Sequence, residues 1–113
     1  MSNLPSKVSM VSLGVKDMAR SVQFYAETLG LTIAGQPGVV TFVQAGDVMI
    51  VLNGPARSGV EVIFPSESVG ATHAELESRG CPFVAAPHEV TPGLWAATFA
   101  DPDGHNLTVL GPQ

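Results

Sequence analysis

The stretch VKDMARSVQFYAETLGL, residues 15–31, carries the clearest structural signal in this sequence. Its apolar side chains recur four, three and four residues apart, at Met18, Val22, Tyr25 and Leu29. This spacing places them along one face of an α-helix. We therefore expect this helix to cover one face of a sheet, with Phe24, Tyr25 and Leu29 as core or helix-packing residues.

Short strands are expected on both sides of this helix. Asp17 is positioned as its N-cap, and Gly30 stands where a left-handed residue ends a helix. Apolar residues that alternate or run together, separated by turn residues, predict strands at 8–15, 32–34, 39–44 and 48–53. The first half of the chain therefore reads as strand, helix and three strands.

The second half repeats this scheme about 50 residues later. Ser68 follows Asp17 by 51 positions as an N-cap, and Gly80 ends the second helix. Strands are expected at 60–66, 83–85, 94–100 and 106–110. The segment Asp101-Pro102-Asp103-Gly104 has the composition of a type I turn, which we prefer to a catalytic carboxylate pair. A repeat of this kind predicts two similar modules, at 8–55 and 59–111, within one α+β domain over 1–113.

These motifs resemble a known family. Residues 15–31 are similar to the first-helix signature of the vicinal oxygen chelate superfamily, and ADPDGHNLTVL, residues 100–110, resembles its last hairpin. The superfamily includes glyoxalase I, extradiol dioxygenases, and fosfomycin- and bleomycin-resistance proteins. The resemblance implies two βαβββ modules that form a curved sheet trough around a ligand, and it implies a homodimer. The sequence leaves open whether the dimer exchanges modules.

The resemblance also implies a test for metal binding. Metal-dependent members hold a divalent ion with four inward-facing His, Glu or Gln side chains, and the matching positions here are Met10, Val51, Glu61 and Thr108. Only Glu61 is a good ligand for a hard or borderline cation. We therefore expect no metal and no cofactor. A non-standard site built from Glu61, His88 in a loop and His105 remains an alternative.

The trough predicted by strand alternation is mostly apolar, with a few hydrogen-bonding groups, which is typical of a small-molecule pocket. Its expected lining is Met10, Ser12, Met49, Val51, Asn53, Glu61, Ile63, Thr98, Asn106 and Thr108. Trp95 either stacks on a ligand at the pocket mouth or packs in a core or dimer interface. Glu61 in such a place loses solvation unless a cation or donor pairs with it. It is then a general acid/base or the partner of a cationic amine; otherwise it is a solvent-exposed edge residue.

Composition narrows the function classes. Ten acidic residues against five basic ones give a net charge of −5, so the basic footprint of a nucleic-acid-binding protein is missing. The lone thiol Cys81, and a first segment without a signal-peptide apolar run, favour a cytoplasmic protein. No membrane association is expected. Two functions remain: a metal-free protein that binds a small molecule, or a glyoxalase- or dioxygenase-like lyase or oxidoreductase that uses Glu61. A pure interaction domain is a third.

Overall fold

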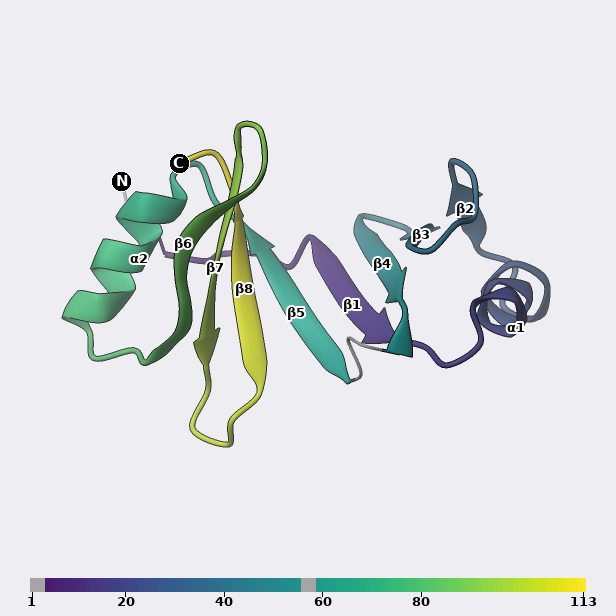
Figure 1. Ribbon diagram of the computed structural model, residues 1–113, viewed down its shortest axis with the longest axis horizontal. Helices are drawn as coiled ribbons and strands as arrows, with labels where there is room; N and C mark the ends of the chain where they lie inside the picture. The colour runs from purple at the N-terminus through teal and green to yellow at the C-terminus, as the bar shows by residue number, and fades with distance from the viewer. Residues whose placement is uncertain (1–3, 56–58) are drawn as a thin grey trace. The chain divides into compact units, whose positions relative to one another are not determined.

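The computed structural model describes residues 4–55 and 59–113, which divide into two compact units. The first unit spans Ser9–Val60, and the second spans Glu61–Gln113 together with the N-terminal residues up to Val8. Both units run strand, helix and three strands (Figure 1). The predicted α+β class with two βαβββ modules is therefore confirmed. Among the described residues, no helix combines the length and the apolar composition needed to cross a membrane.

The helix of the first module changes its winding half-way along. α1 (Met18–Gln23) begins at Asp17, whose carboxylate accepts a 3.1 Å hydrogen bond from the backbone N–H of Arg20. The chain then forms a π-helical turn, η1 (Phe24–Thr28), closed by a 3.0 Å bond from the Leu29 N–H to the Phe24 carbonyl. A π turn contains an extra residue and rotates the side chains that follow it. Phe24 and Leu29 are 47% and 52% exposed, so the prediction that they are core residues is wrong.

The strands of the first module are ordered β2-β3-β4-β1. β1 is parallel to β4, while β3 runs antiparallel to its two neighbours. Val43 and Leu52 are fully buried and share one face, because the register matches Val43 with Ile50 and Thr41 with Leu52. The four strands are β1 (Met10–Gly14), β2 (Thr32–Ala34), β3 (Thr41–Ala45) and β4 (Val48–Asn53).

The second module has the order β5-β8-β7-β6, with α2 (Val69–Ser78) against β6, β7 and β8 (Figure 1). Ser68 caps α2 by accepting a 3.1 Å bond from the Ala71 N–H, as its position predicts. A buried cluster of Val69, Ala97, Phe99 and Val109 fills the space between helix and sheet. The strands are β5 (Val60–Pro65), β6 (Phe83–Thr91), β7 (Leu94–Ala100) and β8 (Asn106–Gly111).

β6 is much longer than the predicted strand at 83–85. It contains Pro87, which argues against a strand because proline cannot donate a ladder hydrogen bond. Edge strands tolerate proline, particularly at bulges, and β6 is an edge strand of its module with a register shift between Ala85 and His88. His88 therefore pairs with Ala96 within the sheet, and the prediction that it lies in a loop is wrong.

The close approach of β8 to the end of β5 gives a stability test. A Cβ atom added at Gly111 would overlap the backbone carbonyl oxygen of Ser66, so one of the two backbone segments would have to move. We expect Gly111→Ala to destabilise the protein by at least about 2 kcal/mol, as overpacking against backbone does. Urea unfolding followed by the fluorescence of Trp95, the single tryptophan, measures this.

Gly54→Ala is the matched control, because nothing lies within 4 Å of the added methyl group. Its unfolding free energy should stay within about 0.5 kcal/mol of the parent value. Equal stabilities for the two variants would contradict the close packing of β8 on the end of β5.

Candidate functional site

One face of the second module's sheet, opposite the Val69–Val109 core, carries the predicted acidic residue. The register matches Thr108 with Ile63 on β5 and with Thr98 on β7. Side chains alternate along each strand, so Glu61 and Asn106 point to the same side as these residues. We call this surface the Glu61 face; it consists of Glu61, Ile63, Ala96, Thr98, Asn106, Thr108 and Leu110. Ala96 and Leu110 were not predicted, although counting two residues from Thr98 and Thr108 finds them.

A chain of hydrogen bonds crosses three strands of the Glu61 face. The Thr108 hydroxyl donates to Oε2 of Glu61 at 2.7 Å, and the hydroxyls of Thr98 and Thr108 lie 2.8 Å apart. Thr108 is only 6% exposed, whereas Glu61 and Thr98 at the two ends are half-buried. The Glu61 carboxylate is therefore held by a donor from within its own module.

The first module has a corresponding surface of different chemistry. The β1–β4 register matches Met10 with Met49 and Ser12 with Val51, and Asn53 follows two residues later on the same side. The Asn53 side-chain amide donates a hydrogen bond to the Ser12 hydroxyl. All five predicted first-module trough residues thus share one face, which we call the Ser12 face. These five residues include a neutral polar pair and no ionisable group.

Trp95 does not belong to the Glu61 face. It is matched with Gly111 and lies three positions from Thr98, which turns its side chain to the opposite side of the sheet. There it packs, partly buried, against the Val69, Ala97, Phe99 and Val109 cluster. Of its two predicted roles, the structure supports packing and not a place beside Thr98 and Thr108.

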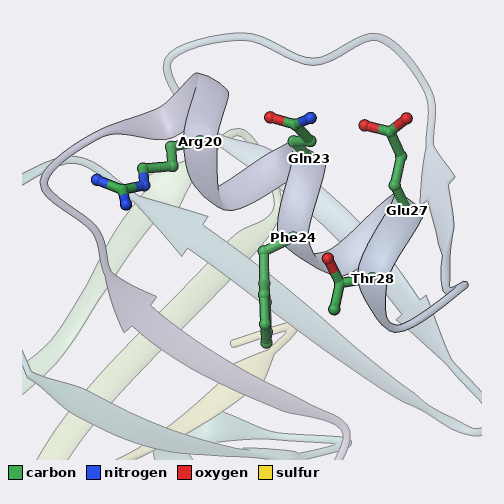
Figure 2. Close-up of a pocket in the computed structure, with 5 residues that line it drawn as sticks. All are labelled: Arg20, Gln23, Phe24, Glu27 and Thr28. Carbon is green, nitrogen blue, oxygen red and sulfur yellow. The ribbon is translucent and has the colours of Figure 1, made fainter.

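An open surface hollow of about 380 Å³ lies on the helix of the first module and contains none of the predicted site residues. Its lining comes from a single helix, at Arg20, Gln23, Phe24, Glu27 and Thr28. Figure 2 shows Gln23 and Glu27 projecting to one side of this helix and Phe24 to the other. These side chains do not converge, so the hollow is a surface feature of the exposed helix.

The sequence matches the family model of the Glyoxalase/Bleomycin resistance protein/Dioxygenase superfamily over residues 7–109. The chain belongs to this superfamily. The resemblance of residues 15–31 and 100–110 is thereby confirmed, and the βαβββ repeat is its structural counterpart. No curated protein matches the chain.

Several solved structures share the fold at low identity. A superfamily member from Vibrio splendidus 12B01 has 18% identity and a TM-score of 0.74, with 92% of this chain and 97% of that one covered. Methylmalonyl-CoA epimerase from Mycobacterium tuberculosis has 14% identity and a TM-score of 0.77, covering 100% and 92%. An Mn(II)-bound glyoxalase from Novosphingobium aromaticivorans has 24% identity and a TM-score of 0.71, covering 94% of this chain and 38% of the other. These likenesses establish architecture alone.

A divalent metal ion is found in some superfamily structures, such as that Mn(II)-bound glyoxalase, so the donor atoms at the matching positions matter. The first module offers a thioether at Met10 and a hydrocarbon at Val51. The second offers the Glu61 carboxylate and the Thr108 hydroxyl, whose proton is already directed at Glu61. Hard and borderline cations require several carboxylate, imidazole or carbonyl donors. These four residues do not fit a divalent metal ion.

The alternative site with His88 and His105 gains no support within the second module. The His88 ring bonds to the Ala86 carbonyl at 2.9 Å, and the His105 ring bonds to the Asp101 carboxylate at 2.8 Å. Within residues 4–55 and 59–113, no group of three or more His, Cys, Asp or Glu side chains could hold a metal ion. His105 and Asp101 instead stabilise the predicted turn, which is closed by a 3.0 Å bond from the Gly104 N–H to the Asp101 carbonyl.

The bond between Thr108 and Glu61 can be tested by a double-mutant cycle. Thr108→Val keeps the shape of the side chain but removes the donor at 2.7 Å, and we expect it to destabilise the protein by about 1–2 kcal/mol. In a Glu61→Gln background the bond is no longer charge-assisted, so the same change should have a smaller effect. Urea unfolding of the four proteins gives the coupling energy.

Thr91→Val on the exposed end of β6 is the control for a threonine-to-valine change in a strand. Its effect should be within about 0.5 kcal/mol in both backgrounds. A Thr108→Val penalty of the same size in the parent and in the Glu61→Gln protein would contradict the charge-assisted bond.

The Asp101 turn predicts a pH dependence of stability. The His105 backbone N–H, the His105 side chain and the Asp103 N–H lower the pKa of Asp101 from its ordinary value of 3.8. A lowered folded-state pKa contributes stability that is present above the unfolded value and is lost as the pH falls through the folded value. The stability difference between the parent and Asp101→Asn should therefore be constant at neutral pH and shrink below pH about 4.

Denaturation at a series of pH values, together with an NMR titration of the Asp101 carboxyl, measures this effect. Asp103→Asn is the control, because the side-chain hydrogen bonds of the turn converge on the Asp101 carboxylate. A difference from the parent that stays constant for Asp101→Asn down to pH about 2 would rule out the lowered pKa.

Proposed function

We propose that this protein binds a small organic molecule through the Glu61 face of its second module, without a metal ion. The observation that carries the proposal is the 2.7 Å hydrogen bond from Thr108 to Glu61. It joins the two second-module positions where metal-dependent relatives would place ligands. A hydroxyl that donates to the carboxylate stabilises its charge without a cation.

The composition of the two faces supports an organic ligand. On each face considered by itself, apolar side chains stand beside a few fixed polar groups, which is the usual make-up of a small-molecule site. The apolar side chains are Met10 and Met49 on the Ser12 face, and Ile63 and Leu110 on the Glu61 face. Glu61 takes part in none of the ion pairs among the described residues. An ammonium or amidinium group of the ligand is a suitable partner for it.

We further propose that the protein is a homodimer in a reducing, cytoplasmic setting. Several large apolar side chains are exposed on the chain, among them Val39 at 90% and Val60 at 63%. Exposed apolar surface supports association, which removes it from water. The single cysteine, Cys81, is consistent with a compartment where disulfides are not formed.

Enzymatic use of Glu61 is the second candidate, and one observation favours it. Oε2 is fixed by Thr108, while Oε1 accepts no hydrogen bond from the described residues. A carboxylate anchored through one oxygen can exchange a proton with a bound substrate through the other. The two candidates differ in whether a bound compound is released unchanged.

Native mass spectrometry of the purified protein tests the proposal. We expect a dimer that carries a bound organic compound and no stoichiometric metal ion, and we expect Glu61→Gln to lose most of that compound. Release of the compound unchanged supports binding alone. Its conversion to a second species by the parent protein, but not by Glu61→Gln, would replace the proposal by the enzymatic one.

A thermal-shift series with Mn²⁺, Ni²⁺ and Zn²⁺ supplies the metal control. A metal at about 100 times its dissociation constant would add about 2.7 kcal/mol of stability and raise the melting temperature by several degrees. We expect shifts below about 1 °C that are the same in Glu61→Ala. A larger shift that disappears in Glu61→Ala would overturn the metal-free proposal.

A further inference from the structure

The hydrogen-bond chain of the Glu61 face has a fixed direction. An ionised carboxylate only accepts hydrogen bonds, so in the 2.7 Å contact the proton belongs to Thr108. A threonine hydroxyl has one proton, and that of Thr108 is thereby used. In the 2.8 Å contact between the two hydroxyls, Thr98 must therefore be the donor.

This direction determines what the face offers to a ligand. Thr98 has directed its only proton to Thr108, so its oxygen presents lone pairs alone. At the other end, Oε1 of Glu61 is likewise an acceptor. Thr108, between them, is 6% exposed and out of reach, while the two ends are half-buried. Within the hydrogen-bonded set of Glu61, Thr108 and Thr98, the accessible polar atoms are therefore all acceptors, although two of the three residues carry a hydroxyl group.

We propose that Thr98 is a specificity-determining residue and that this site selects ligands whose polar group is a hydrogen-bond donor at two points, such as an amidinium, a guanidinium or a primary ammonium group. This inference rests on the proposed binding function and names the ligand class for it. One N–H reaches Glu61 and another reaches Thr98.

Ligands with acceptor groups are rejected by the same chain. A carboxylate or phosphate placed against these three residues would face the Glu61 charge and the Thr98 lone pairs, and none of the three could donate to it, which is costly in a partly buried site. The side-chain amide of Asn106, a donor on the same face, lies at the exposed start of β8. To donate a hydrogen bond to a ligand carbonyl, Thr98 would have to break its hydrogen bond to Thr108. The overall charge of −5 acts in the same sense, because it favours the approach of cations.

Three fragments of equal size separate these cases: benzamidinium is a donor only, benzamide is both donor and acceptor, and benzoate is an acceptor only. Each is titrated into the ¹⁵N-labelled full chain to about 20 mM, the range in which fragments of this size bind. We expect saturable shifts of the Glu61, Thr98 and Thr108 amides with benzamidinium, weaker shifts with benzamide and none with benzoate.

Variants at Thr98 separate hydrogen bonding from charge. Thr98→Val removes the acceptor and leaves Glu61 and its bond from Thr108 intact, so benzamidinium affinity should fall about threefold to tenfold. Thr98→Ser retains the hydroxyl and should bind like the parent. Unchanged amide spectra of both free variants, apart from residues next to the change, verify that they are folded.

The outcomes distinguish the inference from the function on which it rests. Two results would overturn the inference that this face selects donor ligands, while leaving the binding function standing. One is equal affinity for benzamidinium and benzoate at this face; the other is equal affinity of Thr98→Val and Thr98→Ser for benzamidinium. Absence of shifts with all three fragments also overturns it. The binding function itself fails separately, if the native protein carries no organic compound and is stabilised by a metal ion instead.

Discussion

The hydrogen bond from Thr108 to Glu61 controls the chemistry of the second module. A carboxylate on a largely apolar sheet face must be neutralised, paired with a cation or given donors. Here a neighbouring strand supplies the donor at 2.7 Å, and that hydroxyl is supported in turn by Thr98 at 2.8 Å. The parallel pairing of β5 with β8 is what makes this contact possible, because it sets Thr108 opposite Ile63 and beside Glu61. The face therefore keeps one negative charge without needing a bound ion to hold it.

The repeat shows how two similar modules come to present different surfaces. Met10 and Glu61 occupy corresponding positions, as do Val51 and Thr108, yet one pair is apolar and the other is hydrogen-bonded. In the first module the polar contact lies farther along, between Asn53 and Ser12. One face thus contributes neutral polar groups and sulfur, and the other contributes acceptors. In the binding function proposed above, a charged donor group of the ligand is therefore matched by Glu61 on the second module.

Much of this arrangement could be predicted from sequence because it depends on local patterns. Period-two alternation assigned Glu61 and Thr108 to one face, and N-caps at Asp17 and Ser68 fixed both helix starts. The failures come from tertiary context. β6 was predicted too short because it contains Pro87, and proline within a strand is tolerated only at a sheet edge or a bulge. The π turn that begins at Phe24 interrupts the helical period from which the packing face was predicted, and the packing of Trp95 depends on a core built by distant residues.

The hydrogen-bond chain of the Glu61 face could be predicted only in part. The sequence puts two threonines on the face, but their contact depends on the antiparallel register of β7 with β8, which no local pattern fixes. Once the register is known, the direction of the chain follows from proton counting. A metal site built from several carboxylates needs its cation to offset mutual repulsion. A single carboxylate with a hydroxyl donor has no such repulsion to offset. In the proposed site its remaining lone pairs can accept hydrogen bonds, so they favour ligands that carry donor groups.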